Sequence, residues 1–237
     1  MRKAVAVIIA IVGIALWVWP ALAGDIVTMP TANQVGAGDV DLGEYYINYD
    51  FDSPFAPEFV FFTTMYVGVT DWLEIDAIFA DPDKVDSQTI LNATALVLSE
   101  RKGGKADVVV GMRDMGDNLT RMFPPGNGFK PGPFIAAAKT LNPPPGPPTR
   151  ANCPIWRLHL GVGAELGLGT DADNLNDGGL FGGVQALVTP QVGAIALWDG
   201  TDDILGVTYT ATPKSPTFKG GVFGDHWWIG ASYTFTR

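Results

Sequence analysis

The chain has 237 residues and a formal net charge of −10, and 47% of its residues are hydrophobic. The acidic balance argues against nucleic acid as a partner, because a phosphate backbone needs a basic binding surface. The single Cys153 excludes an intramolecular disulfide framework.

The first 23 residues have the pattern of a secretory signal peptide. Arg2 and Lys3 precede an apolar run over residues 4–18, and residues 21–23 form a small-x-small cleavage site. We therefore expect a mature chain that begins at Gly24; the alternative is an N-terminal anchor helix that is not cleaved.

Residues 24–237 show no linker-like boundary, so we expect a single domain. No later apolar stretch approaches the ~18 residues of a transmembrane helix. Alternation of apolar and polar residues with period 2 predicts strands almost throughout. The twelve predicted strands are 40–51, 57–70, 72–80, 89–100, 104–113, 133–141, 155–169, 178–189, 191–199, 203–211, 216–223 and 226–236.

The opening strand sets Tyr45 and Ile47 against Glu44 and Tyr46, and this pattern predicts that Tyr45 and Ile47 belong to its apolar face. In the strand 104–113, Val109 is the one apolar residue on a face that is otherwise polar or glycine.

The strand 155–169 alternates most regularly. Leu158, Leu160 and Val162 share one face, whereas Arg157 and His159 share the other face with several glycines. A soluble β-sandwich also alternates, but its exposed face is usually rich in charged residues and threonine. A face of glycines and single charges instead suits the interior of a narrow barrel, where inward side chains are crowded.

The connections supply independent support. Bacterial outer-membrane barrels have an even number of strands, and their short periplasmic turns alternate with longer outer loops. Residues 71 and 190 are short links, whereas 81–86, 114–132 and 170–177 are longer. Three links break this rule: the links after residue 199 and at 224–225 are short, and 142–154, on the predicted periplasmic side, is long and rich in proline. We therefore predict an all-β fold, a single antiparallel transmembrane β-barrel in the bacterial outer membrane. The alternative of a soluble all-β domain stays open.

In this barrel the polar positions should face the lumen. The lumen-facing candidates are Glu74, Asp76, Asp107, Arg113, Lys139, Arg157, His159 and Glu165. The long segment 114–132 is the predicted obstruction of the lumen, because it has the reach to fold inward.

Several segments resemble the YjbH-like outer-membrane β-barrel family, which is associated with exopolysaccharide systems. The similar segments, in the same order, are 29–38, 108–116, 134–141, 157–163, 180–184 and 198–200. The chain departs from the family at Ala138-Lys139, where the family often has Ser-Lys. The resemblance implies a single barrel with a role connected to polysaccharide.

Three functions remain open at this point. The first is a narrow channel or accessory for polysaccharide or small solutes, the second a structural or adhesive barrel, and the third a small lipid-modifying enzyme. His159 and His226 lack metal-ligand spacing, and Ser232 and His226 are too far apart along one strand to pair. We therefore predict no catalytic, metal or cofactor site. The expected partners are outer-membrane lipid and, from the aromatic C-terminal strand, the barrel-assembly machinery.

Overall fold

The computed structural model describes residues 32–48, 57–84, 86–116, 118, 132–144, 148–163, 180–198 and 203–236. The strands are β1 (Val40–Asn48), β2 (Phe59–Gly68), β3 (Leu73–Pro82), β4 (Gln88–Leu98), β5 (Asp107–Arg113), β6 (Gly132–Thr140), β7 (Ile155–Gly163), β8 (Leu180–Leu187), β9 (Val192–Trp198), β10 (Asp203–Thr210), β11 (Thr217–Phe223) and β12 (His226–Phe235), with one 3₁₀ turn, η1 (Glu100–Lys102). The predicted signal peptide lies outside the described residues. No helix among the described residues is long and apolar enough to cross a membrane.

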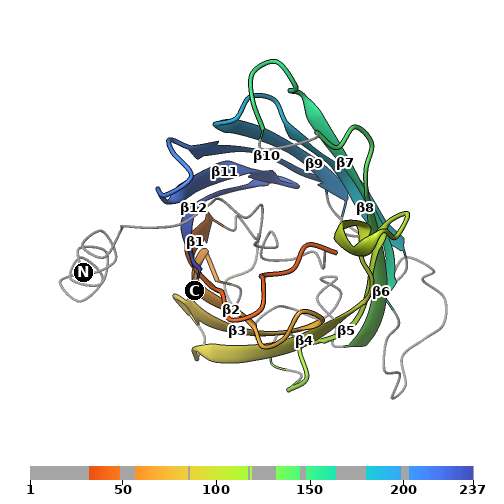
Figure 1. Cartoon of the computed structure of the whole chain (residues 1–237). Helices are drawn as coiled ribbons and strands as arrows, with labels where there is room; N and C mark the ends of the chain where they lie inside the picture. Colours follow the sequence, from red (N-terminus) through yellow and green to blue (C-terminus); the bar gives the residue numbers. More distant parts are fainter. Residues whose placement is uncertain are drawn as a thin grey trace.

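Each strand pairs in antiparallel fashion with its neighbours in sequence, and β1 also pairs with β12 (Figure 1). The sheet is therefore a closed barrel of twelve antiparallel strands, which confirms the predicted fold class. Closure satisfies the backbone groups of both edge strands, which an open sheet would leave unpaired. A bulge between Leu96 and Leu98 in β4 is a register irregularity in the ladder with β5.

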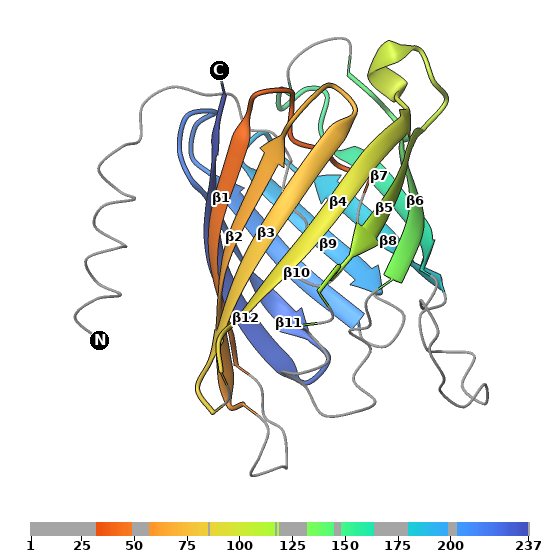
Figure 2. The same cartoon turned by 90° about the horizontal axis from the view of Figure 1, so that it is seen from below.

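The two ends of the barrel differ in their connections (Figure 2). We call one the short-turn end: β1 starts there, β12 ends there, and most connections there are tight turns such as 69–72 and 188–191, the exception being the longer link 141–154 between β6 and β7. The opposite end is the long-loop end, where 114–131 and 164–179 connect strands. Turns at the short-turn end are closed by local hydrogen bonds, as Thr70 shows by accepting from the amides of Trp72 and Leu73.

The alternation places one set of side chains outside the barrel and the other inside. On β7, Leu158, Leu160 and Val162 are exposed, whereas His159 is buried. Every strand carries at least one exposed large apolar residue on its outer face, examples being Leu42, Phe61, Ile75, Leu91, Val110, Ile135, Leu160, Leu180, Trp198, Val207, Val222 and Ile229. The facing predicted for strand 155–169 is thus confirmed over its described residues.

The facing predicted for the opening strand is wrong. Tyr45 and Ile47 are 2% and 3% exposed and point inward, whereas Leu42 is exposed on the outer face. Glu44 shares that outer face, where its carboxylate accepts a hydrogen bond from Thr63 of β2. The prediction failed because apolar side chains occupy the interior as well as the surface of this barrel, so an apolar face does not by itself identify the outside.

Candidate functional site in the barrel interior

The interior has an apolar half and a polar half. Toward the long-loop end, inward positions of most strands carry buried apolar side chains: Ile47, Val60, Phe62, Ile78, Ile90, Phe181, Leu197, Ile204, Phe223 and Trp228. Toward the short-turn end, the inward positions are mainly polar: Asp41, Glu74, Asp107, Thr140, Arg157, Gln185 and Thr234. The change of character therefore follows the barrel axis.

Inward glycines are covered by aromatic rings from the neighbouring strand. A Cβ added at Gly161 would lie 2.1 Å from the ring of Phe181, and one at Gly111 would lie 2.4 Å from the ring of Phe134. Each aromatic residue is the direct cross-strand partner of its glycine. The glycines therefore provide the space in which these rings lie against the wall, rather than leaving that wall bare.

A segment that precedes β1 lies inside the ring of strands (Figure 1). We call residues 32–39 the strap. At its β1 end, the amide of Gly38 donates to the carbonyl of Gly68, and the amide of Gly68 donates to the carbonyl of Asp39. A Cβ at Gly68 would lie 2.0 Å from the carbonyl oxygen of Gly36, so only glycine permits this close approach.

The strap then crosses the short-turn half of the interior. The amide of Val35 donates to Glu74 Oε2 of β3 at 2.5 Å, and Val35 packs against Tyr66. Gln34 Nε2 donates to the carbonyl of Thr94 in β4 at 3.1 Å. The strap is thus held by β2, β3 and β4 in turn.

Its far end is held by β7 and β8. Asn33 Oδ1 accepts a hydrogen bond from Arg157 Nε at 2.8 Å, and Asn33 Nδ2 donates to Gln185 Oε1 at 3.3 Å. Because β3 and β7 are four strands apart around the closed sheet, the strap bridges separated parts of the wall.

Arg157 belongs to a group that we call the charged node: Glu100, Asp107, Lys139 and Arg157. Arg157 Nη2 lies 2.7 Å from Asp107 Oδ2, and Arg157 Nη1 lies 3.3 Å from Glu100 Oε2. Lys139 Nζ lies 2.6 Å from Glu100 Oε1. All three guanidinium nitrogens of Arg157 therefore have partners. These contacts hold the guanidinium in the orientation in which it donates to Asn33.

Glu100 lies in η1, outside the strands. Burial alone would raise the pKa of its carboxyl, but hydrogen bonds from Lys139 and Thr140 outweigh burial and hold the pKa below its usual value. The carboxylate is therefore the favoured form of Glu100, and it anchors the charged node at the mouth of the barrel.

Six of the eight lumen-facing candidates lie at inward positions of the strands. Glu74, Asp76 and His159 are buried at inward positions, and Asp107 and Arg157 meet in the charged node. Arg113 ends β5 at an inward position opposite Gly132. Glu165 lies outside the described residues.

Lys139 does not face the lumen as predicted. Its cross-strand partner is Leu158, which is exposed on the outer face. The long side chain of Lys139 bends from that face to Glu100 at the short-turn rim.

Sequence reasoning missed the strap and its contacts. Asn33 and Arg157 are 124 residues apart, and no periodic pattern marks residues 32–39. The predicted obstruction at 114–132 lies mostly outside the described residues. Among the described residues, no group of three or more His, Cys, Asp or Glu side chains could hold a metal ion.

No family model matches the sequence, and no curated protein is similar to it. Among solved structures, the N-terminal β-barrel domain of OprF from Pseudomonas aeruginosa is similar over 85% of this chain and 100% of that chain. The two are 11% identical, and the TM-score is 0.26.

Proposed function

We propose that this protein is a bacterial outer-membrane β-barrel that provides a narrow passage for small solutes and is constricted at its short-turn end by the strap. The observation that carries the proposal is the path of the strap, which joins Glu74 on one side of the interior to Arg157 and Gln185 on the other.

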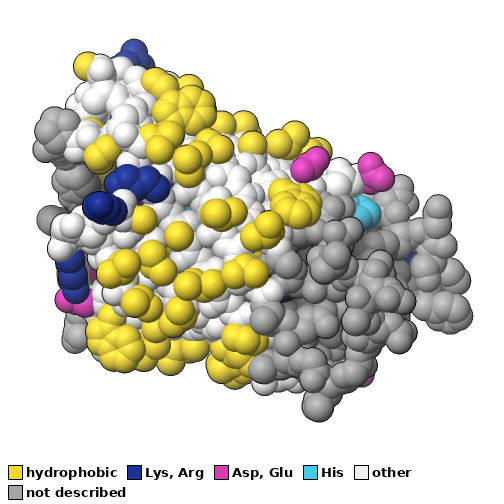
Figure 3. Space-filling model, turned by 90° about the vertical axis from the view of Figure 1, so that its right-hand side faces the viewer, with side chains coloured by type: hydrophobic (Ala, Val, Ile, Leu, Met, Phe, Trp, Pro, Cys, Tyr) yellow, Lys and Arg dark blue, Asp and Glu magenta, His cyan; other side chains and the backbone are white. Residues whose placement is uncertain are grey.

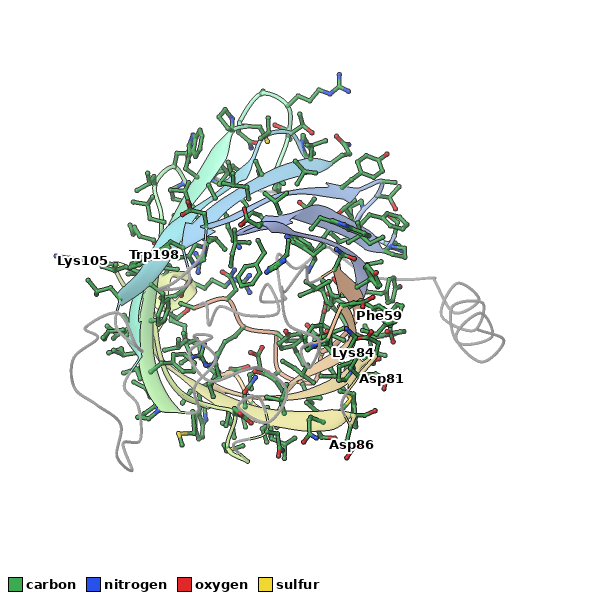
Figure 4. All side chains as sticks on the ribbon, turned by 180° about the vertical axis from the view of Figure 1, so that it is seen from behind. Phe59, Asp81, Lys84, Asp86, Lys105 and Trp198 are labelled. Atoms are coloured by element: carbon green, nitrogen blue, oxygen red, sulfur yellow. The ribbon has the colours of Figure 1, made fainter. Side chains whose placement is uncertain are left out.

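The outer surface supports a place in a membrane. Exposed apolar side chains cover the middle of the face seen in Figure 3, and charged side chains lie toward its ends. The charged residues Asp81, Lys84 and Asp86 belong to the long-loop rim of β3 (Figure 4). A surface this apolar would be unfavourable in water and is what hydrocarbon requires of a spanning barrel.

Aromatic residues at both rims support the same placement. At the long-loop end, Tyr46 contacts Phe59, Phe61 and Trp227, with ring centroids 5.0–5.7 Å apart. At the short-turn end, Trp72 and Trp156 are exposed. Aromatic girdles at the two interfaces are a feature of outer-membrane barrels. Seven of the strands have 9–11 residues, the length of tilted strands across a bilayer.

The strap favours a narrow passage over a wide pore. A barrel of twelve strands is wider than one of eight, whose interior is just filled by side chains. The strap and the polar side chains that hold it occupy part of that additional width at one end. Its side-chain contacts with β4, β7 and β8 are hydrogen bonds, which can be exchanged for water at a modest net cost, whereas Ala32 and Val35 are buried in apolar clusters and hold the strap in the interior.

Conductance in planar bilayers tests the passage. The double variant Asn33→Ala/Gln34→Ala removes the strap's side-chain contacts with β4, β7 and β8 and leaves those with β2 and β3. We expect a several-fold higher conductance than for the intact protein. Gln191→Ala, in the β8–β9 turn, is the matched control and should conduct like the intact protein.

Two results would overturn the proposal. If the intact protein and the double variant both fold, as judged by heat-modifiable gel mobility, and neither conducts, the barrel has a structural or adhesive role. If both conduct equally well, the strap is not the constriction. The polysaccharide role, the assembly-machinery partner and the absence of enzymatic activity stay predictions.

A further inference from the structure

Charge is distributed unevenly between the two ends of the barrel. Among the described residues of the long-loop rim, Lys84 is the one exposed cation, whereas the exposed carboxylates are Glu58, Asp81, Asp83, Asp86, Asp203 and Asp225. At the short-turn rim the exposed charges are mainly cations, and three of them share the connection between β4 and β5: Arg101, Lys102 and Lys105. The whole chain has a formal net charge of −10, so this cationic connection stands apart from the composition.

We call Arg101, Lys102, Lys105 and Lys139 the cationic rim. Lys139 joins the other three because the register of β5 and β6 brings the β5 end of their connection beside it. Lys102 Nζ lies 3.5 Å from Asp71 Oδ2, and both side chains are largely exposed. Arg101 and Lys105 have no ion-pair partner among the described residues. The cationic rim therefore keeps positive charge that a further anion can use.

The connection between β4 and β5 is held in place from the barrel side. The amide of Glu100 donates to Asp107 Oδ1 at 2.8 Å, and this anchors η1 to the charged node. Gly103 follows with a left-handed φ of 89°, and a Cβ added there would meet no atom within 4 Å. Open space thus lies between Arg101 and Lys105 along the chain, so an anionic group can approach the backbone between the two cations.

The cationic rim borders the outer surface of the barrel. The cross-strand partner of Lys139 is Leu158, which is exposed on the outer face, and Lys105 points away from the barrel in Figure 4. Trp72, whose backbone pairs with β4, and Trp156, on β7 beside β6, are exposed at the same end. Tryptophan at the rim of a membrane barrel lies at the level of the lipid headgroups. The cations beside these tryptophans therefore lie at the level of the lipid phosphates.

We propose that the cationic rim binds the phosphate headgroups of anionic phospholipid, with the acyl chains of the same molecules on the apolar outer face of β6 and β7. Lys139 separates a lipid from a soluble anionic partner. Its stem starts beside Leu158 on the face that hydrocarbon covers, and its ammonium group reaches the rim, so a ligand that contacts both must be an amphiphile. This inference rests on the membrane placement within the proposed function and is independent of the passage.

Spin-label spectroscopy of the full chain in phosphatidylcholine vesicles tests the lipid site. The probes are trace amounts of spin-labelled phosphatidylglycerol or spin-labelled phosphatidylcholine. We expect phosphatidylglycerol to associate with the protein several-fold more strongly than phosphatidylcholine, because each Lys or Arg near an anionic headgroup favours association. The preference should fall as the ionic strength rises, since the cations are exposed to water.

Removal of the two charges that lack a partner among the described residues should abolish most of the preference. In Arg101→Gln/Lys105→Gln we expect phosphatidylglycerol to associate nearly as weakly as phosphatidylcholine, and Lys105→Gln alone should lie between this variant and the intact protein. Lys84→Gln is the matched control, because it removes an exposed cation from the long-loop rim, and it should keep the full preference. Heat-modifiable gel mobility checks folding, and the salt dependence of the intact protein decides the test if a variant does not fold.

Three results would overturn the lipid site. The first is equal association of the two lipids with the intact protein. The second is an equal loss of preference in Lys105→Gln and Lys84→Gln, because net charge would then be the cause. The third is a loss of preference in sodium phosphate but not in sodium chloride of the same ionic strength, because free phosphate would then be the ligand.

Insertion and conductance of the same samples separate this inference from the proposed function. A protein that inserts into vesicles and conducts without a lipid preference overturns only the lipid site. A lipid preference without any current overturns only the passage. Failure to insert would contradict the membrane placement on which both proposals rest.

Discussion

The two halves of the interior are filled in different ways. Toward the long-loop end, side chains such as Val60 and Ile204 are 0% exposed and pack together in one apolar cluster. Toward the short-turn end, the strap spans the interior through hydrogen bonds, and the ion pairs of the charged node hold Arg157 at its far end. The apolar half loses packing and leaves a cavity when any part is removed, whereas polar contacts exchange with water. We therefore expect a truncation in the apolar half to cost more stability than the loss of a single contact in the polar half.

The largest effect should follow from a truncation in the apolar half. Phe62→Ala empties a position that is 2% exposed, and we expect it to lower the free energy of unfolding by about 3–5 kcal/mol. Urea titration in lipid vesicles measures this loss.

The adjacent Phe61 provides the control for that measurement. It is 46% exposed on the outer face and contacts Tyr46. Phe61→Ala should cost less than Phe62→Ala, because both lose apolar area that folding removes from water, but only Phe62→Ala also leaves an internal cavity. Equal losses for the two variants would contradict the division between interior and surface.

A smaller change in the free energy of unfolding should follow from protonation of Glu100 in the charged node. The folded-state pKa of Glu100 is below its usual value of 4.5. Its contribution to stability is therefore fully present above the unfolded-state pKa and is lost as the pH falls through the lower folded-state pKa. Urea unfolding of the intact protein and of Glu100→Gln between neutral and strongly acidic pH measures it. The two curves should converge at the acidic end; a constant difference at every pH would exclude a role for this charge.

The sequence predicted the strands and the closed barrel better than it predicted which side chains fill the interior. The alternation over Arg157–Gly163 identified the strand and its two faces because the outer positions are apolar and the inner positions are polar or glycine. The same reasoning reversed the faces of β1, because Tyr45 and Ile47 belong to an interior that is itself apolar. A period of 2 shows that two faces exist, but it does not show which one contacts lipid when both are apolar.

The functional groups of the interior depend on contacts between distant parts of the chain. Asn33 meets Gln185 across 152 residues, and no sequence pattern links the two residues to each other. Lys139 was misplaced because its charge suggested the lumen, whereas its register with Leu158 places it outside. Register and closure determine these neighbours, and composition alone does not reveal them.

Cysteine labelling along β7 tests the central claim, that this barrel spans a membrane with its apolar face in lipid and its polar face inside. Single cysteines at Arg157, Leu158, His159, Leu160 and Val162 would be made in a Cys153→Ser background and reconstituted in vesicles. We predict that a lipid-soluble reagent labels positions 158, 160 and 162 and spares 157 and 159. Equal labelling of both sets by that reagent, or its exclusion from all five positions, would contradict the account.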